Sequence, residues 1–210
     1  MKHRWLPTTA CTLAGALAIG SCTKANKQVA QSGGAASGSV APFGAADVSF
    51  MQGMIGHHAQ ALVMAELAPT HGASPSVLTL CKKIDISQRD EIAMMRQWLA
   101  DRKQPVPDSA KAMAMMMPGM LTPAQLAQLA AARGTAFDRL FLTFMIQHHE
   151  GALTMVKTLF ASPGGGQASE MFRYASDVTA DQTAEIERMQ QMLDSSSPSS
   201  VKPQGAPRNE

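Results

Sequence analysis

Hydrophobic residues recur at helical spacing along four long stretches of the chain. In the first, roughly 48–68, apolar residues three or four positions apart define one face expected to be buried: Phe50, Met54, Ala61, Met64 and Ala65. A second stretch begins at Ser74-Pro75 and reaches about Leu99. Two more cover about 135–161 and 167–194. This spacing is typical of amphipathic α-helices, and no stretch shows convincing strand alternation.

Polar caps and helix breakers delimit these stretches. Asp47 or Ser49 is expected to cap the first helix, and Pro75 occupies the first position of the second. The run Pro-Gly-Gly-Gly at 163–166 separates the last two helices. Four long helices with short turns inside each pair predict an all-α, up-down four-helix bundle.

One pattern occurs twice and organises the chain. Residues 50–58 read Phe-Met-Gln-Gly-Met-Ile-Gly-His-His, and residues 141–149 read Phe-Leu-Thr-Phe-Met-Ile-Gln-His-His. A Gln-x-x-Glu-Ile-x-x-Met segment at 88–95 is likewise repeated at 182–189. The bundle is therefore predicted to consist of two repeated helix pairs. The repeats cover about 47–101 and 135–194, and a methionine-rich connection, 102–134, joins them. Within it, a short helix is predicted to start at Thr122-Pro123 and to end at Gly134.

The N-terminus has the features of an export signal. A basic start precedes an apolar run at 6–20, which is too short to span a bilayer as a helix. The run ends in Ile19-Gly20-Ser21-Cys22, which resembles the lipobox of bacterial lipoproteins. Residues 1–21 are therefore predicted to be a lipoprotein signal peptide, and Cys22 the lipidated first residue. An ordinary secretory signal is the alternative.

The segments around the bundle are expected to lack regular structure. Residues 22–46 are rich in Gly, Ser and Ala and form a flexible tether, residues 47–194 form the bundle, and residues 195–210 form a disordered tail. Thr23 follows Cys22. In bacterial lipoproteins an Asp at this position would favour retention at the inner membrane. By that resemblance the protein is exported and anchored in the envelope, at the outer membrane facing the periplasm. The lipid anchor is the expected membrane contact.

Charge and cysteine content argue against a nucleic-acid-binding protein and against a fold held together by disulfides. Of 18 Lys and Arg, two leave with the signal peptide. The 16 that remain in the mature chain balance its 16 Asp and Glu, so the net charge is zero. Without a basic stripe, a nucleic-acid partner is not expected. Cys81 is the one thiol besides Cys22 in the mature chain, which rules out an intramolecular disulfide framework. Cys81 is predicted to be a small buried hydrophobe, with a soft metal ligand as the alternative.

The paired histidines are the candidate chemistry. Successive helix residues are about 100° apart, and His57 and His58 then flank the centre of the apolar face. The same geometry holds for His148 and His149. The partner helices turn a Glu and a Met of each repeat inward. The candidate metal ligands are His57, His58, His148, His149, Met54, Met145, Glu91, Glu185, Met95 and Met189.

Two interpretations of this buried polar set compete. Buried imidazoles and carboxylates must satisfy one another or bind something, so the glutamates could simply fix the helix register. A metal site is the other interpretation. Di-iron bundles use Glu-x-x-His, whereas Met54 and Met145 stand three residues before the first histidine of each pair. A thioether in place of a carboxylate suits Cu(I) better than Fe(II) or Mn(II), and the lack of cysteine clusters disfavours structural zinc.

The repeated motifs resemble a known bacterial family. The Met-Ile-x-His-His pairs, the Gln-x-x-Glu-Ile-x-x-Met segments and Gly134-x-Ala136-Phe137-Asp138-Arg139-x-Phe141-Leu142 are similar to domain of unknown function 305, over about residues 47–194. The resemblance implies a ferritin-like fold, export, and in some members copper binding through Met and His. It implies no established catalytic residue. Val156 replaces an Ala of the motif, so the two repeats need not be equivalent.

A methionine-rich segment offers a second candidate site. Five methionines crowd into eight residues beside Pro-Gly: Met113, Met115, Met116, Met117 and Met120. Ordinary core packing is the alternative to Cu(I) capture by thioethers.

The sequence thus predicts an envelope protein that sequesters or delivers copper, without an organic cofactor and without a reaction on an organic substrate. A ferritin-like metal-dependent oxidase and a structural or interaction module without metal are the alternatives. The protein partner is open, and a homo-oligomer is one option.

Overall fold

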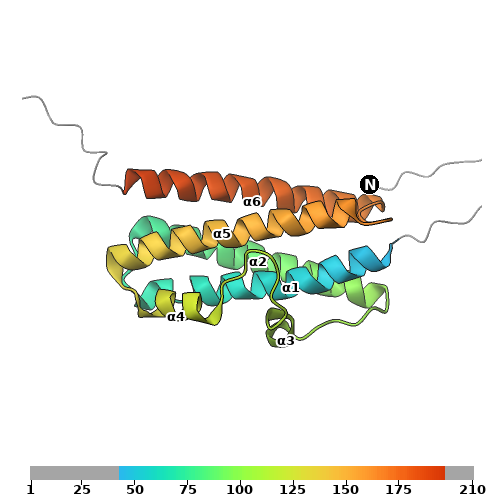
Figure 1. Ribbon diagram of the computed structural model, residues 1–210, viewed down its shortest axis with the longest axis horizontal. Helices are drawn as coiled ribbons and strands as arrows, with labels where there is room; N and C mark the ends of the chain where they lie inside the picture. Colours follow the sequence, from blue (N-terminus) through green and yellow to red (C-terminus); the bar gives the residue numbers. More distant parts are fainter. Residues whose placement is uncertain (1–42, 197–210) are drawn as a thin grey trace, which may run out of the picture. The chain divides into compact units, whose positions relative to one another are not determined.

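The computed structural model describes residues 43–196; the predicted signal peptide, most of the tether and nearly all of the tail lie outside them. In this range the chain is all-helical, without strands, as predicted. The elements are α1 (Ala45–Ala65), η1 (Ala68–Thr70), α2 (Pro75–Asp101), α3 (Ser109–Met113), α4 (Pro123–Ala131), α5 (Gly134–Ala161) and α6 (Ser169–Ser195). Figure 1 shows the four long helices side by side. None of the helices described is long and apolar enough to cross a membrane.

Local capping explains where the helices α2 and α4 start. Ser74 caps α2 by accepting a hydrogen bond from the Val77 amide, and Pro75 follows at the first helical position. Thr122 caps the short helix α4 in a capping box with Gln125. The predicted end of this helix at Gly134 is wrong, because α4 ends at Ala131 and Gly134 is the first residue of α5. These starts confirm the predicted signals.

The predicted cap of α1 is wrong. The cap is Gly44, and Asp47 lies inside the helix in its first turn. The Asp47 carboxylate accepts hydrogen bonds from the amides of Gly44 at 2.8 Å and Gly166 at 2.7 Å. Asp47 is fully buried and ties the start of α1 to the turn after α5. Asp47 therefore has one local partner, the amide of the cap residue, and one partner that is distant in sequence.

The two helix pairs are antiparallel, and they meet along α1 and α5. At the opposite end from Asp47, the Gly134 amide donates to the carbonyl oxygen of His71 at 2.8 Å. The start of α1 therefore lies beside the end of α5, and the turn between α1 and α2 lies beside the start of α5. An up-down bundle of two pairs is the observed architecture; the finer ferritin-like arrangement stays a prediction.

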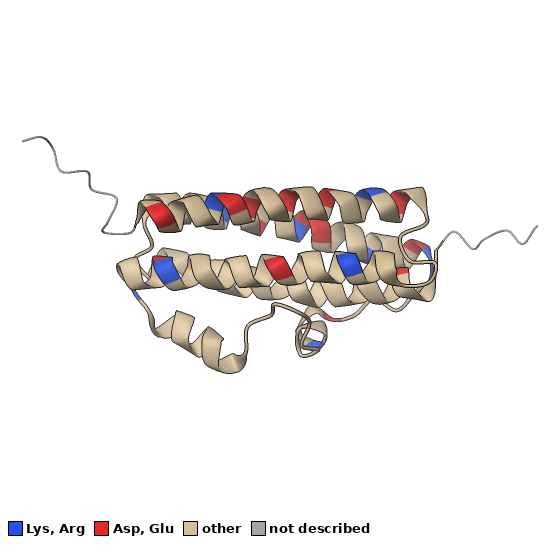
Figure 2. Ribbon diagram, turned by 45° about the horizontal axis from the view of Figure 1, so that its top comes forward, with Lys and Arg blue, Asp and Glu red and all other residues tan. Residues whose placement is uncertain are grey.

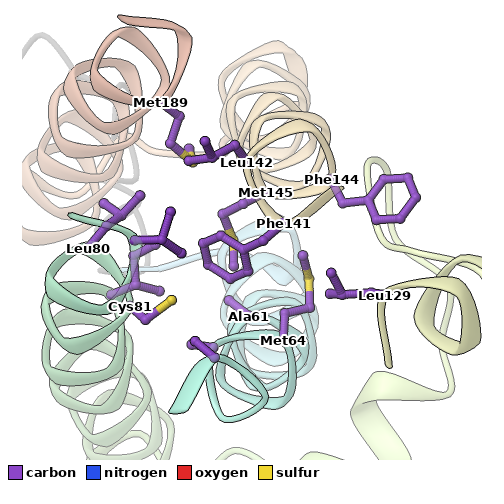
Figure 3. Close-up of a cluster of buried hydrophobic side chains, with 14 of the residues drawn as sticks. Ala61, Met64, Leu80, Cys81, Leu129, Phe141, Leu142, Phe144, Met145 and Met189 are labelled. Carbon is purple, nitrogen blue, oxygen red and sulfur yellow. The ribbon is translucent and has the colours of Figure 1, made fainter. Parts of the chain in front are cut away.

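Two apolar clusters fill the interior and leave a polar layer between them. One cluster, shown in Figure 3, gathers side chains such as Met64, Leu80, Phe141 and Met145. The other contains residues from the opposite halves of the same helices, including Phe50, Trp98, Met155 and Tyr174. The histidine pairs fall between these clusters along both α1 and α5. Cys81 is buried in the first cluster, where burial raises the pKa of its thiol to about 12. It therefore behaves as the predicted buried hydrophobe.

The connection between the repeats packs against the outer side of α1 and α5. We call residues 114–122 the strap. Gln60 fixes it, because its side chain donates to the Leu121 carbonyl at 3.0 Å and accepts from the Leu121 amide at 2.7 Å. Gly119, at φ +76°, lets the strap approach Gly151 so closely that a Cβ on Gly151 would lie 2.0 Å from the carbonyl oxygen of Pro118. The helix α3 in this connection was not predicted, because prolines obscure its short period.

Candidate metal centre

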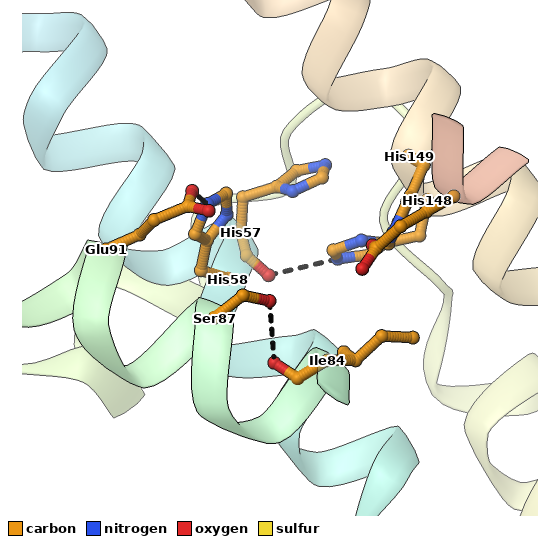
Figure 4. Close-up of polar contacts among 8 residues, drawn as sticks. His57, His58, Ile84, Ser87, Glu91, His148 and His149 are labelled. Atoms are coloured by element: carbon orange, nitrogen blue, oxygen red, sulfur yellow. Dashed lines mark hydrogen bonds and ion pairs between the residues drawn. The ribbon is translucent and has the colours of Figure 1, made fainter. Parts of the chain in front are cut away.

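Four histidines form a polar layer in the interior of the described bundle. His57 and His58 come from α1, and His148 and His149 from α5, and each side chain is at most 1% exposed. Figure 4 shows the two pairs facing each other across the contact between these helices. The helical geometry predicted from the sequence, with both members of each adjacent pair turned inward, is observed.

The outer histidine of each pair is bonded to the glutamate of its own repeat. His58 Nε2 lies 2.6 Å from a carboxylate oxygen of Glu91, and His149 Nε2 lies 2.6 Å from one of Glu185. The glutamates come from α2 and α6 and keep 16% and 21% of their side chains exposed. An ionised carboxylate only accepts hydrogen bonds, so the proton of each imidazole belongs on Nε2.

The inner histidines donate to backbone carbonyls. His57 Nε2 donates to the carbonyl oxygen of Pro118 in the strap at 3.0 Å. His148 Nε2 donates to the carbonyl oxygen of His57, also at 3.0 Å. The two rings lie 3.8 Å apart between centroids. A carbonyl oxygen cannot donate, so these imidazoles also carry their proton on Nε2.

The second ring nitrogen of all four histidines is left without a partner. Nδ1 of His57, His58, His148 and His149 is buried and has no hydrogen-bond partner in the described structure. Burial above all, and then the neighbouring His58, lowers the pKa of His57 to about 3. Burial, followed by His57, likewise lowers the pKa of His148 well below its usual value. Both inner imidazoles are therefore neutral at neutral pH, and their Nδ1 lone pairs are bare.

The predicted methionine ligands lie directly above and below this layer. Met54 and Met95 belong to one apolar cluster and Met145 and Met189 to the other, and all four are fully buried. Across residues 43–196, no group of three or more His, Cys, Asp or Glu side chains is arranged to hold a metal ion. The buried methionines that border the layer are further donors available beside the histidines.

The five methionines of the connection do not share one environment. Met115 and Met116 are exposed, Met113 and Met117 are half-buried, and Met120 is buried with its sulfur accepting from the Met117 amide at 3.3 Å. The strap lines a cavity of about 360 Å³ with Met117 and Pro118, opposite Met155 of α5. Pro118 connects this cavity to His57.

Several residues of the site escaped the sequence analysis. Pro118 contributes a backbone oxygen, which no side-chain pattern announces. Gln60 and Gln147 hold the strap, with Gln147 donating to the Gly119 carbonyl at 3.2 Å. A signal for Gln60 was present, since it is a polar residue one turn after His57 on the apolar face. Met155 also lies on the predicted buried face of its helix, but was not assigned to a site.

The fold and the site define an all-helical bundle with a duplicated, buried histidine layer. Domain of unknown function (DUF305) matches residues 47–193, and the chain belongs to this family. The resemblance seen in the motifs is therefore confirmed. No curated protein matches the sequence.

Solved structures of the family are similar along most of their length. A DUF305 fragment from Deinococcus radiodurans is 31% identical with a TM-score of 0.63, covering 74% of this chain and 99% of the fragment. A DUF305 protein from Streptomyces coelicolor, described as secreted, is 28% identical with a TM-score of 0.63, covering 71% and 93%. CopM in its Cu(I)-bound form is 32% identical with a TM-score of 0.57, covering 71% and 96%. CopM has also been solved with Cu(II) and with silver.

Proposed function

We propose that this protein binds copper, as Cu(I), in the histidine layer, and that it sequesters the ion or delivers it to another protein. The observation that carries the proposal is the set of four buried Nδ1 atoms without partners. Each unsatisfied buried acceptor costs about 1–3 kcal/mol, which a bound ion would offset. Neutral imidazole is also the form of histidine that binds metals.

The donor set favours a soft ion. Sulfur atoms of fully buried methionines lie in both clusters that border the layer, and thioethers prefer Cu(I) over Fe(II) or Mn(II). The similarity to CopM, solved with Cu(I), Cu(II) and silver, supports the same choice. The ligands we assign are Nδ1 of His57, His58, His148 and His149, with thioethers from Met54, Met145, Met95 and Met189.

Glu91 and Glu185 take a different part in this proposal from the one expected from the sequence. Each binds the Nε2–H of a histidine on the side of the ring away from Nδ1. Carboxylates in this position orient metal-binding imidazoles and raise their basicity. We therefore assign them as positioning residues. A di-iron oxidase would need such carboxylates as ligands, so this geometry favours copper storage or transfer over oxidase chemistry.

An architectural network without metal is the competing function. It is favoured by the fact that every Nε2 in the layer already has a protein partner. The four bare Nδ1 atoms argue against it, because a network that only fixes helix register has no reason to leave them unpaired.

We place the protein outside the cytoplasm, anchored through Cys22 to the outer membrane and facing the periplasm. The lipobox-like sequence before Cys22 supports this location, as does the similarity to a relative described as secreted. Cys22 itself lies outside the described residues. The tether would then hold the bundle away from the lipid surface.

Competition for Cu(I) against a chromogenic chelator tests the copper proposal. The variant His57→Gln/His58→Gln should bind Cu(I) at least about tenfold more weakly, since Gln supplies no imidazole lone pair. His71→Gln is the matched control. His71 is also buried, but both of its ring nitrogens have partners, Thr70 Oγ1 at 3.0 Å and the Ala130 carbonyl at 2.9 Å. Equal Cu(I) affinity in the parent and the double variant would contradict the proposal.

A further inference from the structure

A cleft between α2 and α6 opens on the side of the bundle that carries Glu91. Its volume is about 350 Å³, and Glu91, Asp177 and Asp181 line it together with Met94 and Tyr174. Acidic positions recur along α6, with basic positions among them (Figure 2). Within the described range, none of these three carboxylates forms an ion pair with a lysine or arginine. Arg173 and Glu170 line the cleft as well, and Glu170 pairs with Arg102, so the lining keeps an excess of negative charge.

A buried hydroxyl group faces the same cleft without a partner. Tyr174 is 6% exposed, and its hydroxyl has no hydrogen-bond partner among the described residues. Burial, and then the nearby Glu91 carboxylate, raises the pKa of Tyr174 well above its usual value, so the phenol stays neutral. A neutral oxygen beside several carboxylates is a ligand or a water-binding group for a hydrated cation.

Like charges in the cleft remain close together. Burial, followed by Glu91, Glu185 and Asp177, raises the pKa of Asp181. The charges of both glutamates that hold the outer histidines, one from each repeat, therefore act on Asp181. A cation in the cleft would relieve this repulsion.

Glu91 connects the cleft directly to the buried layer. The same carboxylate lines the cleft and accepts the hydrogen bond of His58 at 2.6 Å. On the other side of the layer the strap covers His57, held by Gln60 and Gln147. Glu91, with 16% of its side chain exposed, is therefore in contact both with solvent in the cleft and with an imidazole of the layer.

We propose that the acidic α2–α6 cleft is the route by which hydrated metal cations reach the histidine layer, with Asp177, Asp181 and Tyr174 attracting the ion and Glu91 marking the inner end of the cleft, beside His58. This inference rests on the proposed copper function. No three carboxylates are placed to chelate an ion, so the cleft holds a cation transiently with its water and releases it inward. An excess of one sign of charge in a cleft raises association rates of oppositely charged ligands, by up to about 10- to 1,000-fold.

Stopped-flow mixing with Ag(I), a redox-stable soft ion that stands in for Cu(I), tests the route when loading is followed by quenching of tryptophan fluorescence. The variant Asp177→Asn/Asp181→Asn should load about tenfold more slowly than the parent at low ionic strength, with an unchanged equilibrium affinity. Raising the salt to about 0.15 M shortens the screening length to about 8 Å and should slow the parent much more than the variant. Glu187→Gln/Asp194→Asn removes two charges from α6 outside the cleft and should load like the parent.

Two results would overturn the inference while leaving the copper function intact. One is an unchanged loading rate in Asp177→Asn/Asp181→Asn with normal equilibrium binding. The other is slow loading in Met117→Leu/Met155→Leu instead, which would place the route at the cavity beside the strap. Absence of copper binding to the parent at equilibrium would contradict the proposed function itself, and with it the route.

Discussion

His57 and His148 pack against each other at the contact between the two repeats, with 3.8 Å between the centroids of their tilted rings and His148 Nε2 donating to the His57 carbonyl. They are equivalent positions of the repeat, 91 residues apart. The contact is nevertheless one-sided, because His57 donates to Pro118 in the strap and not to α5. The connection between the repeats therefore makes the two halves of the layer unequal.

The buried inner histidines predict an acid-sensitive apo protein. The folded-state pKa of His57 is about 3, against 6.5 for a free side chain, and that of His148 is lowered in the same direction. Between about pH 3 and pH 6.5, His57 binds a proton in the unfolded chain but not in the folded protein. Stability is therefore complete above about pH 6.5 and declines as the pH falls toward 3, by about 1.4 kcal/mol per pH unit for each such histidine.

Urea unfolding of the apo protein at pH 7 and pH 5 measures this slope. The variant His57→Gln/His148→Gln should lose most of the pH dependence, whereas His71→Gln should keep it. A midpoint in the parent that does not move between the two pH values would show that the inner imidazoles are not buried as described.

The glutamates are predicted to tune metal affinity without being ligands. In Glu91→Gln the amide oxygen still accepts from His58 Nε2, so the apo unfolding midpoint should change little. Loss of the charge should weaken Cu(I) binding by about 10- to 100-fold. Glu185→Gln makes the equivalent change in the second repeat. Comparing the Cu(I) affinities of the two variants in a chelator competition shows whether the two repeats contribute unequally to binding. Complete loss of binding in either variant would make that glutamate a ligand instead.

The close approach of the strap to α5 predicts opposite effects for two glycine substitutions. A Cβ on Gly151 would lie 2.0 Å from the Pro118 carbonyl oxygen, so Gly151→Ala must displace the strap and the acceptor of His57. The free energy of unfolding should fall by about 1–3 kcal/mol. Gly53→Ala is the control, since its Cβ would meet only the flexible ends of Met117 and Met155, at 3.3–3.5 Å.

Both substitutions gain up to about 1 kcal/mol of helix propensity, so Gly53→Ala should be neutral or stabilising. Denaturant midpoints of the two variants measure the difference. Equal midpoints would show that the strap does not press on α5.

Lipid anchoring predicts that Cys22→Ser leaves the protein soluble or unprocessed in cells. Cys11→Ser, which changes another cysteine of the same N-terminal region, should fractionate with membranes like the parent. Membrane fractionation and the apparent mass of the processed chain are the measurements. If Cys22→Ser stays with the membranes, the lipoprotein assignment is wrong and an ordinary secretory signal is the better interpretation.

Local patterns in the sequence were enough to predict the four long helices and the burial of the histidine pairs. Helical spacing fixes the burial of His57 and His58 without knowledge of any neighbour, and Ser74 and Thr122 cap their helices through contacts within three residues. The motif resemblance also placed the chain in its family. These features depend on residues close together in the chain, which is why sequence alone reveals them.

Contacts between distant segments were beyond the sequence. Asp47 was expected to cap α1, but its second partner, Gly166, lies 119 residues away. The acceptor of His57 is a backbone oxygen in an aperiodic, proline-rich segment, so no pattern pointed to Pro118. The choice of Nε2 or Nδ1 as the free nitrogen likewise depends on such partners. The sequence could therefore name the histidines but not the atoms that bind.

Nitrogen-15 NMR of the histidine side chains, recorded before and after addition of Ag(I), tests the central claim most directly. Silver is a diamagnetic soft ion, and CopM has been solved in a silver-bound form. We predict that all four imidazoles of the apo protein carry their proton on Nε2, and that Ag(I) shifts Nδ1 resonances of the layer while Nε2 keeps its proton. His71 should not respond. Histidine spectra unchanged by Ag(I), or a response at Nε2 in place of Nδ1, would contradict the account.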